Sequence, residues 1–86
     1  MPEISRFFGI VIRIHYADHS PPHFHAVYQG RSVEIDIRTL AIIEGRIAPR
    51  ALGLTLEWAA LHQEELATSW QLAAAGQAPR RIAPLQ

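Results

Sequence analysis

The 86-residue chain contains no cysteine, no lysine and no long apolar run. Without cysteine there is no disulfide framework, no thiolate metal site and no cysteine nucleophile, so any metal ligand must come from His, Asp or Glu. No apolar run approaches the roughly 20 residues that cross a bilayer, and residues 1–5 lack the charged and apolar segments of a signal peptide. These absences predict a cytoplasmic protein with no membrane contact.

A charge excess of either sign is also missing. The eight basic residues are all arginine and they balance eight acidic residues, which gives a net charge of zero. A neutral chain lacks the long-range field of a strongly basic nucleic-acid binder, although a local basic patch can still exist. Arginine suits bidentate recognition of phosphate or carboxylate, so nucleic acid stays a partner that the net charge does not support.

Two periodicities divide the chain. Residues 4–45 contain short runs rich in β-branched residues, separated by turn residues, and this predicts an antiparallel meander of three to five short strands, the last of them at residues 39–43. Residues 49–75 space apolar side chains by three and four, which predicts one bent helix, or two helices separated near residues 62–63. We expect an α+β fold in which the helical part packs on one face of the sheet. The expected single domain spans residues 1–86, with a β-sheet half at 1–45, a helical half at 46–78 and an extended tail at 79–86.

Strand parity predicts two chemically different faces of the sheet. Side chains alternate between faces, so apolar positions of one parity mark the face under the helices. That face should contain Ile10, Ile12, Ile14, Phe24, Ala26, Tyr28, Val33, Ile35 and Ile37. The opposite face then collects the ionisable side chains Arg13, His15, His23, His25, Glu34 and Asp36.

Three of the five histidines lie in the segment at residues 18–25, Asp-His-Ser-Pro-Pro-His-Phe-His. Imidazole binds metals and transfers protons near neutral pH, so this segment is the first candidate site. Two histidines at alternate positions of one strand can ligate a divalent ion such as Zn²⁺ or Mn²⁺, with neighbouring side chains completing the shell. The candidate metal ligands are His23, His25, His19 and Asp18, with His15 and Glu34 as further choices.

Three other interpretations of these residues stay open. In the first, His23 or His25 exchanges protons in catalysis while Arg13 stabilises negative charge. In the second, the ionisable side chains form an ordinary solvated sheet face with weak cross-strand pairs. In the third, the imidazoles are structural and bond to the loop backbone around a turn of unusual, even cis, proline geometry.

An interaction surface is a further prediction. A domain of this size is marginally stable alone, so we expect either a homodimer or a small protein partner, possibly one encoded beside it. Trp58 is either a core residue or an interface anchor. The candidate contacts for a protein or nucleic-acid partner are Arg6, Arg13, His15, Arg50, Trp58 and His62.

Four segments of the chain, at residues 4–12, 18–26, 49–52 and 57–62, resemble a small bacterial family described as domain of unknown function 4160. The most specific of them is Asp-His-Ser-Pro-Pro-His-Phe-His-Ala at residues 18–26. The resemblance implies a protein often found beside a second small protein and assigned, from gene context, to toxin–antitoxin or regulatory modules. It implies no catalytic residues.

Two functions follow from these observations. The preferred one is a protein-binding component of a toxin–antitoxin-like or regulatory module, which is not an enzyme. The alternative is a small metal-assisted or histidine-based hydrolase or nuclease centred on His23 and His25.

Overall fold

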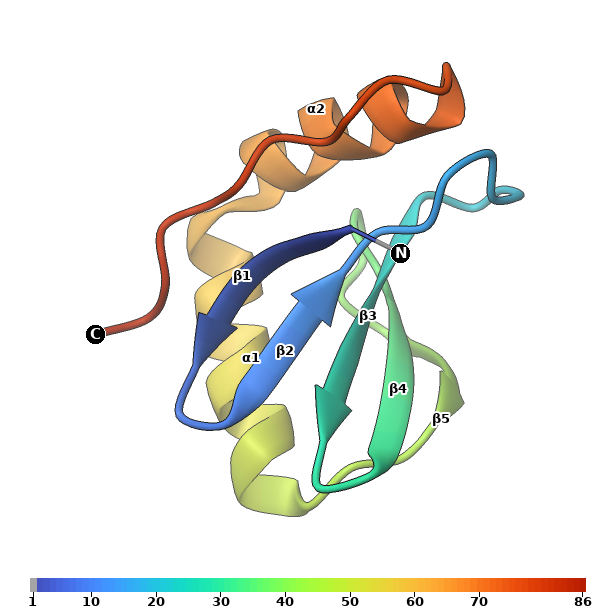
Figure 1. Ribbon diagram of the computed structural model, residues 1–86. Helices are drawn as coiled ribbons and strands as arrows, with labels where there is room; N and C mark the ends of the chain where they lie inside the picture. The colour runs from blue at the N-terminus through green and yellow to red at the C-terminus, as the bar shows by residue number, and fades with distance from the viewer. Residues whose placement is uncertain (1) are drawn as a thin grey trace.

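The computed structural model describes residues 2–86 as a five-stranded antiparallel sheet followed by two helices (Figure 1). The strands lie side by side in sequence order, so each is joined to the next by a short connection or loop. They are β1 (Glu3–Phe7), β2 (Ile10–Arg13), β3 (His23–Tyr28), β4 (Arg31–Asp36) and β5 (Ile42–Gly45). The helices are α1 (Pro49–Leu61) and α2 (Gln63–Ala74). The predicted α+β fold is confirmed, with two helices in place of one bent helix.

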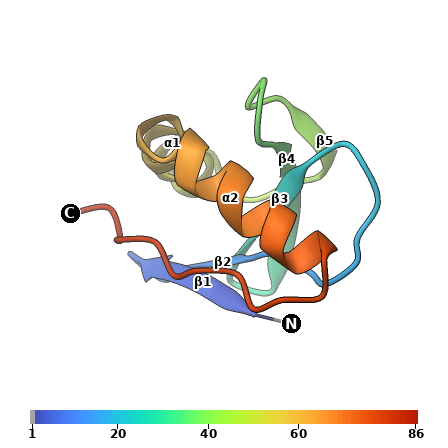
Figure 2. The same ribbon diagram turned by 90° about the horizontal axis from the view of Figure 1, so that it is seen from above.

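The core lies between the helices and the sheet face that strand parity predicts. All nine residues expected on that face are buried except Tyr28, which is partly buried and packs against the core. Seen from above, α2 crosses the end of the sheet at which β2 ends and β3 begins (Figure 2). This placement brings α2 next to the loop that carries the histidine segment. No helix within residues 2–86 is long and apolar enough to span a membrane.

Local sequence accounts for the start of α1 and for both ends of α2. Pro49 occupies the first turn of α1, where its missing N–H costs nothing. Glu64 and Glu65 lie in the first turn of α2, where carboxylates interact favourably with the positive end of the helix dipole. Gly76 has φ +79° just beyond α2, a left-handed conformation that glycine adopts without strain.

The tail at residues 79–86 is docked against the body of the protein. The indole N–H of Trp58 donates to the carbonyl of Ala83 at 2.8 Å, and the N–H of Ile82 donates to the carbonyl of Ile4 at 2.8 Å. The side chain of Ile82 is buried in the core. The tail therefore covers the outer edge of β1, and β5 is left as the open edge of the sheet.

The structure corrects two details of the sequence interpretation. Trp58 is fully buried against Phe7 and Phe24, so its side chain belongs to the core and no partner can reach it in the folded protein. The last strand starts at Ile42 and not near residue 39, because Asp36 builds a turn. Its carboxylate accepts the N–H groups of residues 38 and 39 at 2.7 and 3.0 Å.

Candidate functional site

The loop between β2 and β3 folds back over the start of β3 and builds the candidate site. It is anchored at both ends, because the N–H of Ala17 donates to the carbonyl of Ala73 in α2 and the carbonyl of Pro22 accepts the N–H of Ile37. The peptide bond between Ser20 and Pro21 is cis, as the structural interpretation of the segment foresaw. This anchoring places the carboxylate of Asp18 over the first residues of β3.

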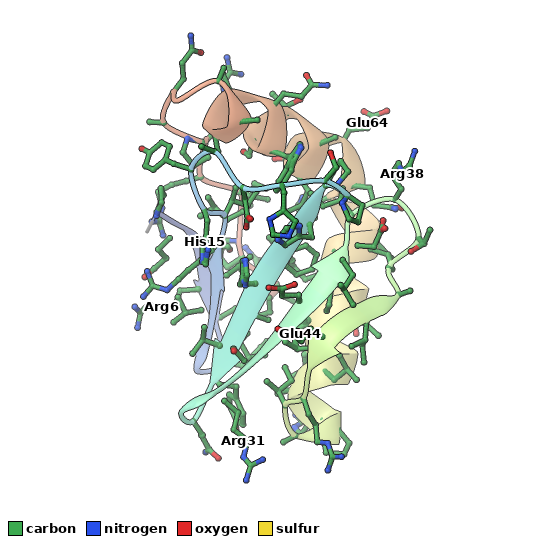
Figure 3. All side chains as sticks on the ribbon, turned by 90° about the vertical axis from the view of Figure 1, so that its right-hand side faces the viewer. Arg6, His15, Arg31, Arg38, Glu44 and Glu64 are labelled. Carbon is green, nitrogen blue, oxygen red and sulfur yellow. The ribbon has the colours of Figure 1, made fainter. Side chains whose placement is uncertain are left out.

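Asp18 is the centre of the site, because four histidines surround its carboxylate. Its Oδ2 atom lies 3.0 Å from His23 Nε2, 3.6 Å from His25 Nε2 and 3.9 Å from His15 Nδ1. Its Oδ1 atom lies 3.1 Å from His19 Nδ1 and accepts the backbone N–H of the same residue. In Figure 3, His15 lies toward the end of the sheet that carries the loop between β2 and β3. Residues from the loop that follows β2 and from β3 thus meet at one carboxylate.

His23 is enclosed and hydrogen-bonded through both ring nitrogens. Its Nδ1 atom is 2.7 Å from the carbonyl oxygen of Pro21, and its ring packs against Trp70 of α2. The carbonyl and the Asp18 carboxylate can both only accept, so the two bonds coexist only when the ring carries two protons.

His25 and His15 form a parallel stack, with ring centroids 3.8 Å apart and planes 5° apart. The Nε2 atom of His25 is buried and forms no hydrogen bond within residues 2–86. Its Nδ1 atom lies 3.7 Å from Glu34 Oε1, on the neighbouring strand β4. An unbonded, buried imidazole nitrogen beside a carboxylate is a candidate metal ligand.

The electrostatics keep the stacked rings neutral and the central carboxylate ionised at neutral pH. Burial lowers the pKa of His15, and the neighbouring His25 lowers it further. Burial also lowers the pKa of His25, against the opposing effect of Glu34. Burial acts to raise the pKa of Asp18, but the His19 backbone N–H and the nearby His23 ring outweigh it and lower that pKa. These are the protonation states that metal coordination requires.

Two overlapping triads could hold a metal ion. In the first, one ligand atom from each of His15, Asp18 and His25 lies within 4.8 Å of the other two. The second triad consists of His23, His25 and Glu34. The first triad supplies three protein ligands and leaves a fourth position for water or substrate, as catalytic zinc sites do.

The ligand set expected from sequence is therefore divided by the fold. Asp18 and His25 share a triad with His15, while His23 belongs to the other triad and holds Asp18 through a hydrogen bond. The side chain of His19 is 91% exposed and belongs to neither triad. Sequence reasoning missed the contact between His23 and Trp70, since no local pattern reports how a helix packs on a distant strand.

The remaining candidate residues lie in different places. Arg13 pairs in register with His25, so it adjoins the site on β2. Arg6 binds Glu3 at 2.7 Å, and His62 binds Glu65 at 2.6 Å. The other candidate contacts are Arg50, which is exposed in the first turn of α1, and Trp58, which is in the core.

The fold and this geometry define a small α+β protein with a site lined by histidine and aspartate at one end of its sheet. The sequence profile of the family described as "Domain of unknown function (DUF4160)" matches residues 9–71, and the chain belongs to this family. The match includes every residue of both triads. Comparisons with curated proteins and with solved structures give no significant match.

Proposed function

We propose that this protein binds a divalent transition-metal ion, Zn²⁺ in the first instance and Mn²⁺ as the alternative, through His15, Asp18 and His25. The observation that carries the proposal is the convergence of two imidazole nitrogens on Asp18 Oδ2, with His25 Nε2 at 3.6 Å and His15 Nδ1 at 3.9 Å. Imidazole and carboxylate ligands suit both metals, and a cysteine-free chain has no softer ligand to offer.

The triad needs only a small rearrangement to close around an ion. Ligand atoms of a four-coordinate zinc ion are about 3.3 Å apart, given bonds of about 2.0–2.1 Å. The stacked rings must tilt, because each imidazole lone pair lies in its own ring plane and one ion cannot lie in two parallel planes. His15 is the side chain that can move, since it follows the end of β2 and is only partly buried.

Replacing Asp18 with asparagine is expected to weaken Zn²⁺ binding by about 100-fold, because the amide keeps the shape of the side chain but removes the central anionic ligand. Isothermal titration of the wild-type protein and Asp18→Asn with Zn²⁺ and Mn²⁺ measures the effect. His62→Gln is the matched control, because it removes an imidazole that also faces a carboxylate but lies outside the site. Equal affinity for wild type and Asp18→Asn, or no saturable binding to wild type, would refute the proposal.

A metal-assisted hydrolase or nuclease is the activity that an open fourth position would support. Arg13 pairs in register with His25, which supports a role for its guanidinium in stabilising a negatively charged substrate. His23 is a poor proton carrier here, because its ring is buried and both nitrogens are bonded. Metal-dependent cleavage of a phosphodiester in the titrated samples, absent in Asp18→Asn, would support this activity.

A second candidate function is binding of a small protein partner in a toxin–antitoxin-like or regulatory module, and the open edge of β5 favours it. All four residues of β5 are exposed, and Ile42 and Ile43 are among the most exposed large apolar residues. Exposed edge strands are sites where a partner adds a strand. Glu44 forms no ion pair within residues 2–86, and β5 contains no basic residue. A partner strand that carries a basic residue therefore complements this edge better than a second copy does.

Ile43→Lys is expected to abolish the complex with a small protein partner, for which the product of a neighbouring gene is the first candidate, because it places a charge in the shared strand pair. Co-expression followed by size-exclusion chromatography measures complex formation. Leu61→Lys is the matched control, since Leu61 is equally apolar and more exposed but lies on α1. A wild-type homodimer that Ile43→Lys converts to monomer would contradict the choice of partner.

A further inference from the structure

The end of the molecule opposite the histidine site brings together two hairpin turns and the start of α1. The turns between β1 and β2 and between β3 and β4 lie beside the first residues of α1 at the bottom of Figure 1. Figure 3 shows Arg31 at this end, with His15 toward the other. We call the surface formed by Phe8, Tyr28, Arg31, Arg46 and Arg50 the turn-end surface.

Two adjoining cavities hollow the turn-end surface, and they share Tyr28 as a common wall. One has a volume of about 230 Å³ and is lined by Tyr28, Arg31 and Arg46 together with the segment before α1. The other has a volume of about 270 Å³ and is lined by Phe8, Tyr28 and Arg50 with apolar residues of β2 and α1. Among residues 2–86, no carboxylate lines either cavity. Both cavities thus combine an aromatic wall with at least one guanidinium.

The charges of the turn-end surface are not compensated locally. Arg31, Arg46 and Arg50 are exposed, and none of them forms an ion pair in the described part of the chain. Arg6 and Arg81 differ, because both contact the carboxylate of Glu3. The chain is neutral as a whole, so this end carries a positive field that the rest of the surface balances. Exposed guanidinium groups bind phosphate, as they bind carboxylate, through paired hydrogen bonds.

Phe8 adds an unusual aromatic side chain to this surface. Its side chain is 59% exposed and its backbone has φ +50°, a left-handed conformation that is costly for a bulky residue. The ring contacts Phe7 edge-on, with planes at 82°. An exposed phenyl ring held outward beside arginines is the combination on which unpaired bases stack.

We propose that the turn-end surface binds a short single-stranded nucleic acid, with phosphates on Arg31, Arg46 and Arg50 and a base stacked on Phe8. A duplex fits less well, because its bases are already stacked and cannot enter the two cavities. An acidic peptide would use the arginines but would leave the exposed phenyl ring without a stacking partner. The site is separate from the histidine cluster and does not depend on a metal.

The test measures fluorescence anisotropy of a labelled single strand of about 12 nucleotides, a length within the range that single-strand binders occupy. Three phosphate contacts predict that log K falls against log[salt] with a slope of about −2 between roughly 50 and 200 mM salt. Phe8→Ala is expected to weaken binding by about 5- to 100-fold through lost stacking. Each of Arg31→Gln, Arg46→Gln and Arg50→Gln should reduce the slope by about 0.7.

Arg38→Gln is the matched control, because it removes an exposed arginine at the opposite end of the molecule from Arg31 (Figure 3). Circular dichroism of each variant checks that the fold is intact. Weak binding of a duplex of the same length supports the proposal. The proposal is overturned if wild type does not bind at the lowest salt, if Arg38→Gln weakens binding as much as Arg46→Gln, or if an acidic peptide competes as well as the oligonucleotide.

Discussion

Replacing Trp58 with alanine is expected to lower the free energy of unfolding by about 3–5 kcal/mol, because it empties the largest fully buried side-chain volume in the core. The indole packs on Phe7 and Phe24 from two strands, with ring centroids 5.3 and 5.9 Å away. It also holds the tail through the bond to Ala83. An 86-residue domain has a total stability of roughly 4–13 kcal/mol, so this variant should lose a large part of its stability and unfold at a much lower urea concentration than the wild type.

Urea denaturation followed by circular dichroism measures the effect of the Trp58 change. Trp58→Phe is the conservative variant, because it keeps a ring in the core and loses only part of the packing and the bond to the tail. Leu61→Ala is the surface control on the same helix and should change stability by less than about 0.5 kcal/mol. A stable Trp58→Ala protein that has lost partner binding would contradict the assignment of Trp58 to the core and would place it in a partner interface.

The fold could be predicted because its signals are local. The alternation of apolar residues in β2, β3 and β4 identifies the buried face, and a change to helical spacing marks where the sheet gives way to helices. The break between α1 and α2 coincides with acidic residues that suit a new helix start. The predicted start of the last strand, at residue 39, was wrong, because the side chain of Asp36 caps a turn that no alternation pattern reveals.

The site could be predicted only in part, because its geometry depends on strand register and on loop folding. Sequence proximity groups His19 with His23 and His25, but the loop turns His19 into solvent. Arg13 pairs with His25, so the chain just beyond β2 runs beside β3. There the ring of His15 stacks on the ring of His25. Register is a long-range property, so the composition of the histidine segment could not reveal which imidazoles share Asp18.

The protein is expected to lose stability in two steps as the pH falls, because several groups have folded-state pKa values below their ordinary values. For His15 and His25, whose pKa values burial lowers from 6.5, the unfolded state binds more protons below that pH. The contribution of these two histidines to the free energy of unfolding is complete above pH 6.5 and is lost as the pH falls toward their lowered pKa values. This is the upper step.

The lower step comes from carboxylates. The pKa of Asp36 is lowered from 3.8 chiefly by the backbone N–H of Thr39, and the pKa of Asp18 is also lowered. Their contribution is present above pH 3.8 and is lost as the pH falls through the lowered values. The hydrogen bond from Arg6 lowers the pKa of Glu3 to about 2, but this exposed pair is screened by solvent and adds little.

Thermal unfolding measured at a series of pH values should show the midpoint falling by roughly 10 °C or more between about pH 7.5 and pH 3. His15→Gln should flatten the upper step, because the group that gains a proton on unfolding is gone and the charge repulsion on His25 is reduced. Asp36→Asn should flatten the lower step and leave the upper one. His19→Gln is the control, since the side chain of His19 is 91% exposed and belongs to neither triad. If the midpoint of His15→Gln falls with pH as that of the wild type does, the stacked rings are not held neutral by burial. The triad would then lack the protonation state that a metal ion requires.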